Sequence, residues 1–539
     1  MVDHLAIGLA PPIAAVGALK GLGIVAATLA AAGTFALPLA RDRAVAALVA
    51  VALTPALVLA ELWRSDQVRH LRDHPDRAVA AAIIGVAIVA FLAALFRRRP
   101  QLVPFLAVLT LPVRLPIETG QTSANLLVPL YLVVAGGVVA YAADRLWRPS
   151  RHPGVVVGDG SGSPWRERPA GALELALLAF VVLYALESLY SSDFEQAVKN
   201  VAFFYVPFAL LFKLLTTVRW TRRLVLQCSA LAVALALLFV TIGFWEYASR
   251  QLLWNRKVIE SNQFESYFRV NSLFFDPNIY GRFLAVVMVG VASTLLWARR
   301  RRDVLLAAGA LAVLLAGLVL TFSQSSFAAL LVGLAALAAL RWDARRVGYA
   351  VAASLVAAGA LVLAIHGSLH LGGHRSLNRS SSGRVKLVEG GLRMFADRPV
   401  WGFGSGSFAE RYRAREKVGS PQAASASHTT PITVAAEQGL IGLLAYVAVV
   451  VAAFRRLFSG LGPLRGRDPP GRLVSRAFLA AGFAVLAFHT LLYAAFLEDP
   501  IAWTLLAVGA VLSDRLGPVP EPVTRAAPSA PTPAAPGDA

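Results

Sequence analysis

Long apolar segments recur along the whole chain and alternate with short polar connectors. Most of them have roughly the 20 residues that an α-helix needs to cross the hydrocarbon core of a bilayer. They are continuously apolar, whereas the strands of a membrane barrel alternate apolar with polar positions. The expected spans are 20–39, 44–62, 77–96, 101–116, 125–143, 171–190, 199–216, 223–245, 282–298, 303–321, 325–340, 348–365, 437–454, 476–496 and 500–513. The sequence therefore predicts an all-α, polytopic integral membrane helical bundle of about 14–15 transmembrane helices.

Composition supports this fold class. Hydrophobic residues make up 57% of the 539 residues and charged residues only 15%, and the mean hydropathy is +0.64. These values exclude an ordinary soluble protein. Cys228 is the single cysteine and lies inside an expected span, so an internal disulfide and a cysteine metal cluster are excluded.

The formal net charge of +20 is concentrated in particular connectors. Basic clusters fall at every second connection between spans, as the positive-inside rule predicts for cytoplasmic loops. The positive charge therefore reflects the orientation of the protein in the membrane, and no nucleic-acid partner is expected. The clusters lie at 97–99, 145–151, 219–223, 299–302, 341–346 and 455–476.

This topology places two long loops, 246–281 and 366–431, on the outer face of the membrane. Loop 366–431 is rich in arginine and glycine and is the one large extracytoplasmic loop of the predicted fold. The connector 63–76 is an exception, since it should lie outside yet carries three arginines. The N-terminus is external if residues 5–39 hold one span and internal if they hold two.

The first candidate motif is SYFRVNSLFFDPNIYGRFL at 266–284, which contains Arg269 and Asn278. Asp276 followed by Pro277 is typical of a helix start, because Asp caps exposed amides and Pro suits the first turn. A helix start does not explain Arg282, which enters a span from the outer face against the positive-inside bias. An ionisable residue at membrane depth indicates a functional site.

The second motif, SSGRVKLVEGGLRMFADRPVWGFGSGSFAERY, occupies 381–412. Its apolar spacing predicts a short amphipathic helix on the outer surface, followed by a glycine-rich turn. Arg384 and Arg393 are nine residues apart, about two and a half turns, which places them on opposite faces of that helix. Interfacial arginines that snorkel to lipid headgroups are the alternative interpretation for both.

The third motif, SHTTPITVAAEQGLIGLLAYV, occupies 427–447. His428 ends the polar loop, and Glu437 stands where the next span begins. Near neutral pH a histidine can accept a proton from a hydroxyl group. A solvated loop histidine is the alternative interpretation.

Together these motifs resemble the O-antigen ligase/polymerase superfamily of integral membrane glycosyltransferases. The resemblance covers roughly residues 200–455. It rests on RVNSLFFDPN before a span, on Ser-Gly-Arg384 followed by Asp-Arg-Pro and GFGSGSF, and on nine residues between Thr429 and Gly439. The sequence departs from the family pattern in having Thr429 after the histidine, Val388 four residues after Arg384, and no arginine after Ser323.

The resemblance implies transfer of a glycan from an undecaprenyl-diphosphate carrier to a glycan, lipid or protein acceptor, at the outer face of a bacterial cytoplasmic membrane. It does not separate ligase, polymerase and protein-glycosylating members. It implies catalytic roles for His428, Arg282 and Arg384. We also expect Arg269, Asp276, Asn278, Arg393 and Glu437 to bind substrate.

The expected mechanism needs no cofactor or metal and inverts the sugar carbon. Arginines would stabilise the negative charge that grows on the departing diphosphate. A zinc site is the alternative at His366, His370 and His374, whose spacing would align them on one helix face. Gly367, Gly372 and Gly373 interrupt such a helix, so we expect no metal.

The expected organisation has four parts. Residues 1–200 hold N-terminal transmembrane helices with a cytoplasmic linker at 146–170, and residues 200–455 form the ligase-like core. Residues 456–515 hold C-terminal transmembrane helices, and 516–539 form a disordered, Pro- and Ala-rich cytoplasmic tail. A lipid-linked glycan flippase or another polytopic transporter is the alternative function, although such a protein needs charges along a path through many spans.

Overall fold

The computed structural model describes residues 13–63, 68–69, 73–119, 122–147, 165–253, 268–350, 352–353, 384–416, 427–465, 469 and 471–514. Within these ranges, 12 helices are long and apolar enough to cross a membrane. The predicted polytopic helical class is confirmed. One helical span that the sequence predicts, 348–365, lies almost entirely outside the described residues.

Within the described residues, the first half of the chain contributes six long helices that follow the predicted apolar segments, and the short helices α5 and α8. They begin and end near polar or proline residues, as expected when an apolar run alone sets the helix length. These elements are α1 (Ile13–Ala36), α2 (Ala40–Leu62), α4 (Pro75–Arg98), α5 (Leu102–Thr110), α6 (Val128–Trp147), α7 (Ala172–Glu187), α8 (Phe194–Asn200) and α9 (Val206–Thr217).

The second half adds further membrane-length helices and two short polar ones. Its elements are α10 (Arg222–Ser249), α12 (Pro277–Trp297), α13 (Arg301–Leu320), α14 (Gln324–Arg341), α17 (Arg384–Asp397), α18 (Phe408–Glu416), α19 (Thr430–Phe458), α20 (Gly471–Leu492) and α21 (Pro500–Asp514). A π-helix, η2 (Val201–Tyr205), joins α8 to α9, and 3₁₀ turns lie at Ser188–Tyr190 and Gly462–Arg465.

The predicted span 101–116 is wrong as a single helix. Its helix, α5, is only 9 residues long, roughly 14 Å at 1.5 Å per residue and too short to cross a bilayer. The chain then forms an antiparallel hairpin of β1 (Leu115–Thr119) and β2 (Thr122–Leu126) before α6 begins. Pairing of the two strands satisfies backbone groups that an unpaired segment would leave exposed.

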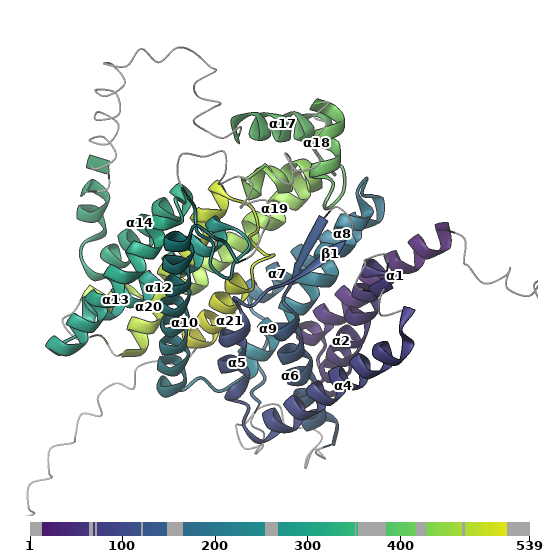
Figure 1. Cartoon of the computed structure of the whole chain (residues 1–539), viewed down its shortest axis with the longest axis horizontal. Helices are drawn as coiled ribbons and strands as arrows, with labels where there is room; N and C mark the ends of the chain where they lie inside the picture. The colour runs from purple at the N-terminus through teal and green to yellow at the C-terminus, as the bar shows by residue number, and fades with distance from the viewer. Residues whose placement is uncertain are drawn as a thin grey trace, which may run out of the picture.

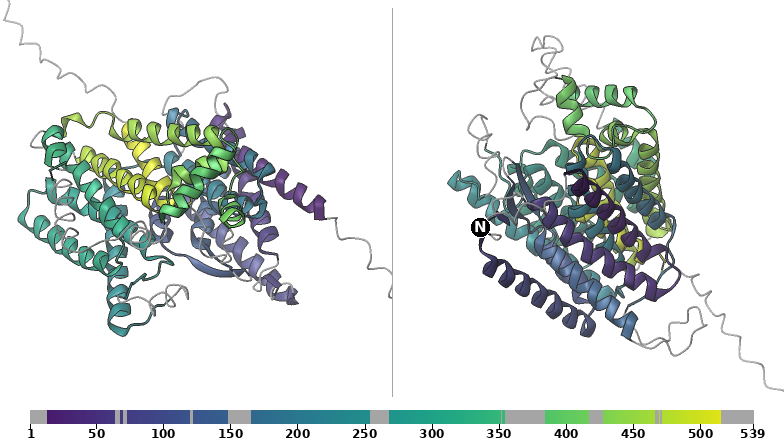
Figure 2. Two further views of the ribbon diagram at one scale, coloured as in Figure 1. Left: turned by 90° about the horizontal axis from the view of Figure 1, so that it is seen from above. Right: turned by 90° about the vertical axis from the view of Figure 1, so that its right-hand side faces the viewer.

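The helices form two groups that share a common centre (Figures 1 and 2). In one, α1 packs on α2, α7 and α9, and α4 packs on α6. In the other, α12 packs on α13, α14 and α20. Both groups meet at α19 and α21, because α19 contacts α7 and α20 while α21 contacts α9 and α20.

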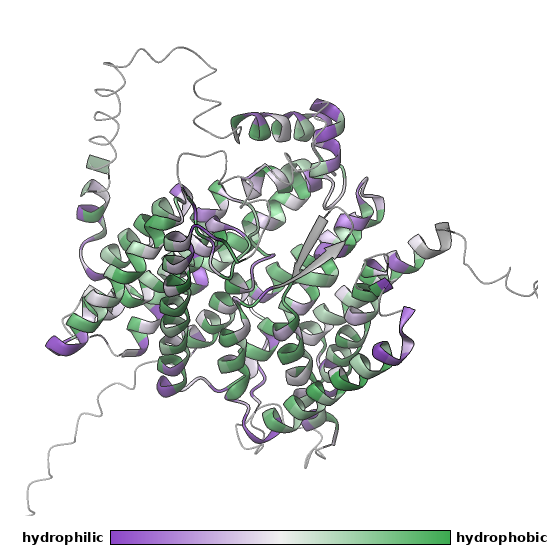
Figure 3. Ribbon diagram, viewed as in Figure 1, coloured by the Kyte–Doolittle hydropathy of each residue, from purple (hydrophilic) through white to green (hydrophobic). Residues whose placement is uncertain are grey.

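Helices α17 and α18 lie at one end of the bundle, above α19 (Figure 1). We call this the α17 end. The basic clusters near the ends of α4, α6, α12, α14 and α19 fall at the opposite end. Figure 3 shows hydrophobic residues along the long helices and hydrophilic residues at their ends and on α18.

Candidate functional site

A cavity of about 340 Å³ lies where the two groups of helices meet. Its walls come from segments that are far apart in sequence: the turn before β1, α7, α8, α12, the start of α19 and the loop 493–499. The polar side chains that line it are Arg114, Tyr184, Gln196, Asn200, Tyr205, Arg282, His428, Thr430, Thr433, Glu437, Gln438, Tyr446, Tyr493 and Glu498. Three predicted site residues, Arg282, His428 and Glu437, therefore share one cavity.

Arg282 is fully buried on the first turns of α12. Its guanidinium forms an ion pair with Asp499, with 2.7 Å between Nη2 and Oδ2, and donates a hydrogen bond to the carbonyl oxygen of Ala495 at 2.9 Å. Ala495 adopts a φ of +73°, a conformation that costs energy for a residue with a side chain. Arg282 thus holds the 493–499 loop against α12.

His428 lies immediately before α19, with a φ of +58°. The residues on either side fix this turn. The Ser427 hydroxyl donates to the Thr429 carbonyl at 2.7 Å, accepts from the Thr429 amide at 3.2 Å, and lies 2.7 Å from the Thr433 hydroxyl. A non-glycine residue in this strained conformation persists only where its surroundings hold it, and such positions cluster at functional sites.

Tyr493 joins His428 to the start of α12. Its ring lies 5.5 Å from the imidazole centroid of His428 and 5.8 Å from that of His489. Its hydroxyl donates to Asp276 Oδ2 at 2.6 Å, while Asp276 Oδ1 accepts the first amides of α12. Burial and the neighbouring carboxylate of Asp276 raise the pKa of Tyr493, which keeps the hydroxyl a donor.

Glu437 anchors the glycine-rich turn. Its carboxylate accepts the backbone N–H groups of Gly406 at 2.8 Å and Phe408 at 3.1 Å, and its carbonyl accepts that of Gly404 at 2.8 Å. Gly402 has a φ of +64°, and an added Cβ would lie 2.1 Å from the Glu437 carbonyl oxygen. The turn therefore requires glycine, and its fixed position brings Gly406 to the wall of the cavity.

A second polar network lies beside the cavity and involves Arg269 and Asn278. Arg269 donates to the carbonyl of Thr321 at 3.0 Å and to Asn278 Oδ1 at 3.3 Å. The Ser323 hydroxyl also donates to Asn278 Oδ1, at 2.8 Å. His489 Nε2 lies 3.2 Å from the hydroxyl oxygens of both Ser325 and Ser326. These contacts join the loop before α12 to the start of α14.

The two predicted arginines of the amphipathic helix lie differently. Arg384 is the first residue of α17, and its side chain is outside the described part of the structure. Arg393 is exposed on α17 and pairs with Glu389 at 3.6 Å and Glu416 at 3.5 Å. It is not among the residues that line the cavity.

The proposed zinc ligands His366, His370 and His374 fall outside the described residues. Among the residues that are described, no group of three or more His, Cys, Asp or Glu side chains could hold a metal ion.

Sequence reasoning missed Arg114, Tyr493 and the role of Glu498 in the cavity. Burial raises the pKa of Glu498 to about 7, while Arg282 opposes that rise and Asp499 adds to it. Arg114 carried a usable signal, since it stands near the outer end of an apolar segment, as Arg282 does. Tyr493 carried no such signal, because only the folded chain brings it to His428.

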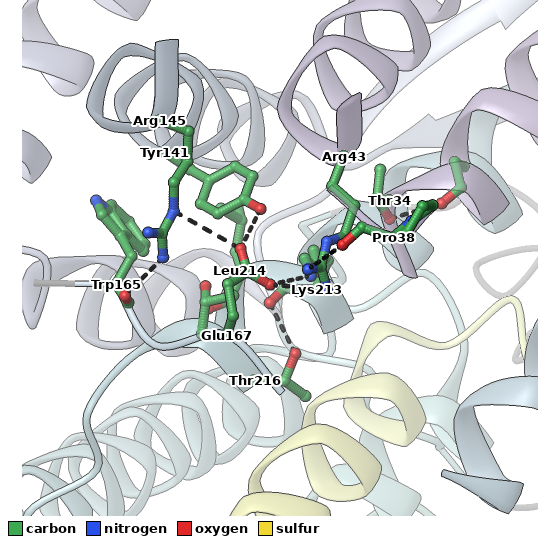
Figure 4. Close-up of polar contacts among 12 residues, drawn as sticks. Thr34, Pro38, Arg43, Tyr141, Arg145, Trp165, Glu167, Lys213, Leu214 and Thr216 are labelled. Atoms are coloured by element: carbon green, nitrogen blue, oxygen red, sulfur yellow. Dashed lines mark hydrogen bonds and ion pairs between the residues drawn. The ribbon is translucent and has the colours of Figure 1, made fainter. Parts of the chain in front are cut away.

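A second buried cluster lies at the opposite end of the bundle and is centred on Glu167 (Figure 4). Lys213 and Arg43 lie 3.0 Å and 3.3 Å from its carboxylate, Arg145 lies 3.7 Å away, and Tyr141 donates a hydrogen bond. Although burial alone would raise the pKa of Glu167, Lys213 and Tyr141 together hold it below its usual value. This cluster fastens the described end of the linker 146–170 to α2, α6 and α9.

Part of the chain matches a known protein family. Residues 309–447 match the family model of the O-antigen ligases. Over this segment the chain is similar to the O-antigen ligase-related family. This family of membrane proteins contains glycosyltransferase-like ligases and polymerases, which indicates a glycosyl-transferring role. No curated protein matches the chain.

The O-antigen ligase match contains α14, α17, α18 and the first part of α19. It therefore includes Arg384, Arg393, His428 and Glu437. Arg114, Arg282 and the loop 493–499 lie outside it, although they form part of the cavity wall.

Proposed function

We propose that this O-antigen ligase-related protein is a membrane glycosyltransferase. It transfers a glycan from an undecaprenyl-diphosphate carrier to a glycan, lipid or protein acceptor at the outer face of the cytoplasmic membrane. The observation that supports this most is the shared cavity of Arg282, His428 and Glu437. That cavity lies toward the α17 end, opposite the basic connectors that the positive-inside rule assigns to the cytoplasm.

The proposed reaction is a direct displacement. The acceptor oxygen attacks the anomeric carbon, the bond from that carbon to the diphosphate oxygen breaks, and its electron pair goes to the diphosphate. His428 accepts the proton that the acceptor hydroxyl loses. Attack from the face opposite the leaving group inverts the anomeric carbon.

Arginine supplies the charge that this reaction needs. Negative charge grows on the diphosphate as the bond breaks, so a guanidinium aimed at it stabilises the transition state more than the ground state. Arg282 and Arg384 are the proposed catalytic arginines, and Arg269, Asp276, Asn278, Arg393 and Glu437 the proposed substrate-binding residues. Arg269, Asp276 and Asn278 act through the loop that leads into α12.

The test is a transfer assay with the purified full-length protein in lipid, an undecaprenyl-diphosphate-linked glycan and the host's acceptor fraction. With a chelator present, the wild-type protein should form the joined product. His428→Ala should lose roughly 10²–10⁴-fold in rate, the usual contribution of a general base. His74→Ala, which changes a histidine of the 63–76 connector, is the matched control.

Two results would contradict the proposal. Wild-type rates in His428→Ala would remove the proposed base, and complete loss of activity on chelation would show that the reaction requires a metal. In cells, His428→Ala should let carrier-linked glycan accumulate on the outer leaflet; accumulation on the cytoplasmic leaflet would favour a flippase.

A further inference from the structure

The two arginines of the cavity are held in different ways. Arg282 is fully buried, and its guanidinium is already engaged by Asp499 and the Ala495 carbonyl. Arg114 is half-buried and lines the same cavity. Among the described residues, its side chain has no ion pair and no hydrogen bond. Its Nε is buried without a partner, as is the Nε of Arg282, so the two arginines differ in the ion pair that Arg282 makes with Asp499.

The local backbone structure explains why the Arg114 side chain lies in the cavity wall. Helix α5 ends at Thr110, a turn closes with a 3.1 Å hydrogen bond from the Val113 amide to the Thr110 carbonyl, and β1 begins at Leu115. Helix α5 packs on α6, α9 and α10, so this turn is fixed inside the bundle. The short helix and the hairpin together deliver Arg114 to the cavity wall.

The acidic groups that face Arg114 already bond to other residues. Burial lowers the pKa of Arg114, and the charges of Asp499 and Asp276 act against that shift while Arg282 adds to it. Asp499 pairs with Arg282 and accepts the Ile501 amide. Asp276 caps α12 and accepts the Tyr493 hydroxyl. A buried cation without a bonded partner is costly, and a bound anion would remove that cost.

We infer that Arg114 is the guanidinium that binds the diphosphate of the carrier, and that Arg282 is a positioning residue that holds the 493–499 loop. This inference rests on the proposed function for the identity of the carrier. It adds to the site a residue that neither the sequence motifs nor the family match contains. For direct contact with the diphosphate, Arg114 takes the place of Arg282, whose proposed catalytic role becomes one of positioning.

The test measures binding of farnesyl diphosphate, inorganic pyrophosphate and farnesol to the full-length protein in lipid nanodiscs. Arg114→Gln should weaken binding of both diphosphates by about tenfold or more, because a charge-assisted contact is lost. Arg114→Lys should recover only part of the affinity, since an ammonium lacks the planar fork of donors. Farnesol binding should not change.

Two further variants separate direct contact from positioning. Arg282→Gln should lower the unfolding temperature, because the buried Asp499 loses its partner, and Arg282→Gln combined with Asp499→Asn should recover part of that loss. Arg114→Gln should unfold at the wild-type temperature. Arg415→Gln, which changes another arginine at the α17 end that pairs with Asp397, is the matched control and should bind all three probes normally.

Wild-type affinity of Arg114→Gln for farnesyl diphosphate would overturn the inference, and so would a wild-type protein that binds neither diphosphate. Loss of diphosphate binding in Arg282→Gln without any change in unfolding temperature would overturn the division of roles. A wild-type protein that binds diphosphate through Arg114 yet transfers no glycan would refute the proposed function and leave this inference standing.

Discussion

The two buried polar regions of the bundle use charge in opposite ways. One region lies at the end of the bundle opposite the α17 end, which we call the linker end. There, three cations and a tyrosine converge on one carboxylate, Glu167 (Figure 4). Near the α17 end, arginines, carboxyls and an imidazole line a cavity of about 340 Å³. The first region fastens a linker to three helices. The second keeps polar groups directed at a cavity, which we propose to be the substrate site.

Arg282 shows that a residue in the cavity wall need not be one that contacts a bound molecule. Its pair with Asp499 resembles the contacts of Glu167, since both tie a connecting segment to the helices. Arg114 differs, because no described side chain or carbonyl engages it. The difference between the two arginines is the ion pair, which Arg282 makes with Asp499 and Arg114 makes with no described residue.

The largest expected effect on stability lies at the linker end. Glu167→Gln leaves Lys213, Arg43 and Arg145 without their shared carboxylate, and we expect a loss of about 3 kcal/mol in the free energy of unfolding. Turnover per folded molecule should stay at the wild-type value. Denaturant titration in detergent measures the first quantity and the transfer assay the second.

Glu195→Gln, which removes an exposed carboxylate on α8, is the control for Glu167→Gln and should change stability by less than about 0.5 kcal/mol. Equal effects of the two substitutions would show that the Glu167 cluster is no more than a set of surface contacts. A fall in turnover with unchanged stability would give Glu167 a direct role in the reaction.

A smaller effect is expected from Glu498 in the cavity. Because burial raises its pKa to about 7, the carboxyl becomes negative between pH 6 and pH 8. The charged and titratable groups that act on it are Arg282, Asp499, Glu437, Tyr184 and Tyr205. Its new charge should repel a diphosphate, so affinity for farnesyl diphosphate should fall on the order of tenfold over this range.

Glu498→Gln should reduce this pH dependence, since the amide stays neutral, and the ionisation of the ligand is common to both proteins. Binding titrations at pH 6, 7 and 8 measure the difference. If the variant and the wild-type protein show the same decline, another group causes it, and His428 is the first candidate.

The long helices could be predicted from the sequence because an apolar run of membrane length has few alternatives. Segments such as 223–245 and 303–321 correspond to α10 and α13 within a few residues. The segment 101–116 could not be placed correctly by hydropathy, since apolar residues continue past the end of α5 at Thr110 into the turn before the hairpin. The break in α19 at Gly439, where φ is +63°, also left no mark on the apolar pattern.

The site was predicted only in part. Motifs identified Arg282, His428 and Glu437 because each is a polar residue at the edge of a span. The contacts that decide their roles join distant segments, as in the Arg282–Asp499 pair and the hydrogen bond from Tyr493 to Asp276. Such pairs depend on how helices pack, and local sequence spacing does not encode that packing.

The central claim is that the cavity is the transfer site and opens to the outer face. Thr430→Cys, which places a thiol in the cavity wall, tests it directly in a Cys228→Ser background. A charged, membrane-impermeant thiol reagent added to intact cells should label this cysteine and abolish glycan transfer, and farnesyl diphosphate should slow labelling in spheroplasts. Labelling only after the cells are opened, or normal transfer by fully labelled protein, would contradict the claim.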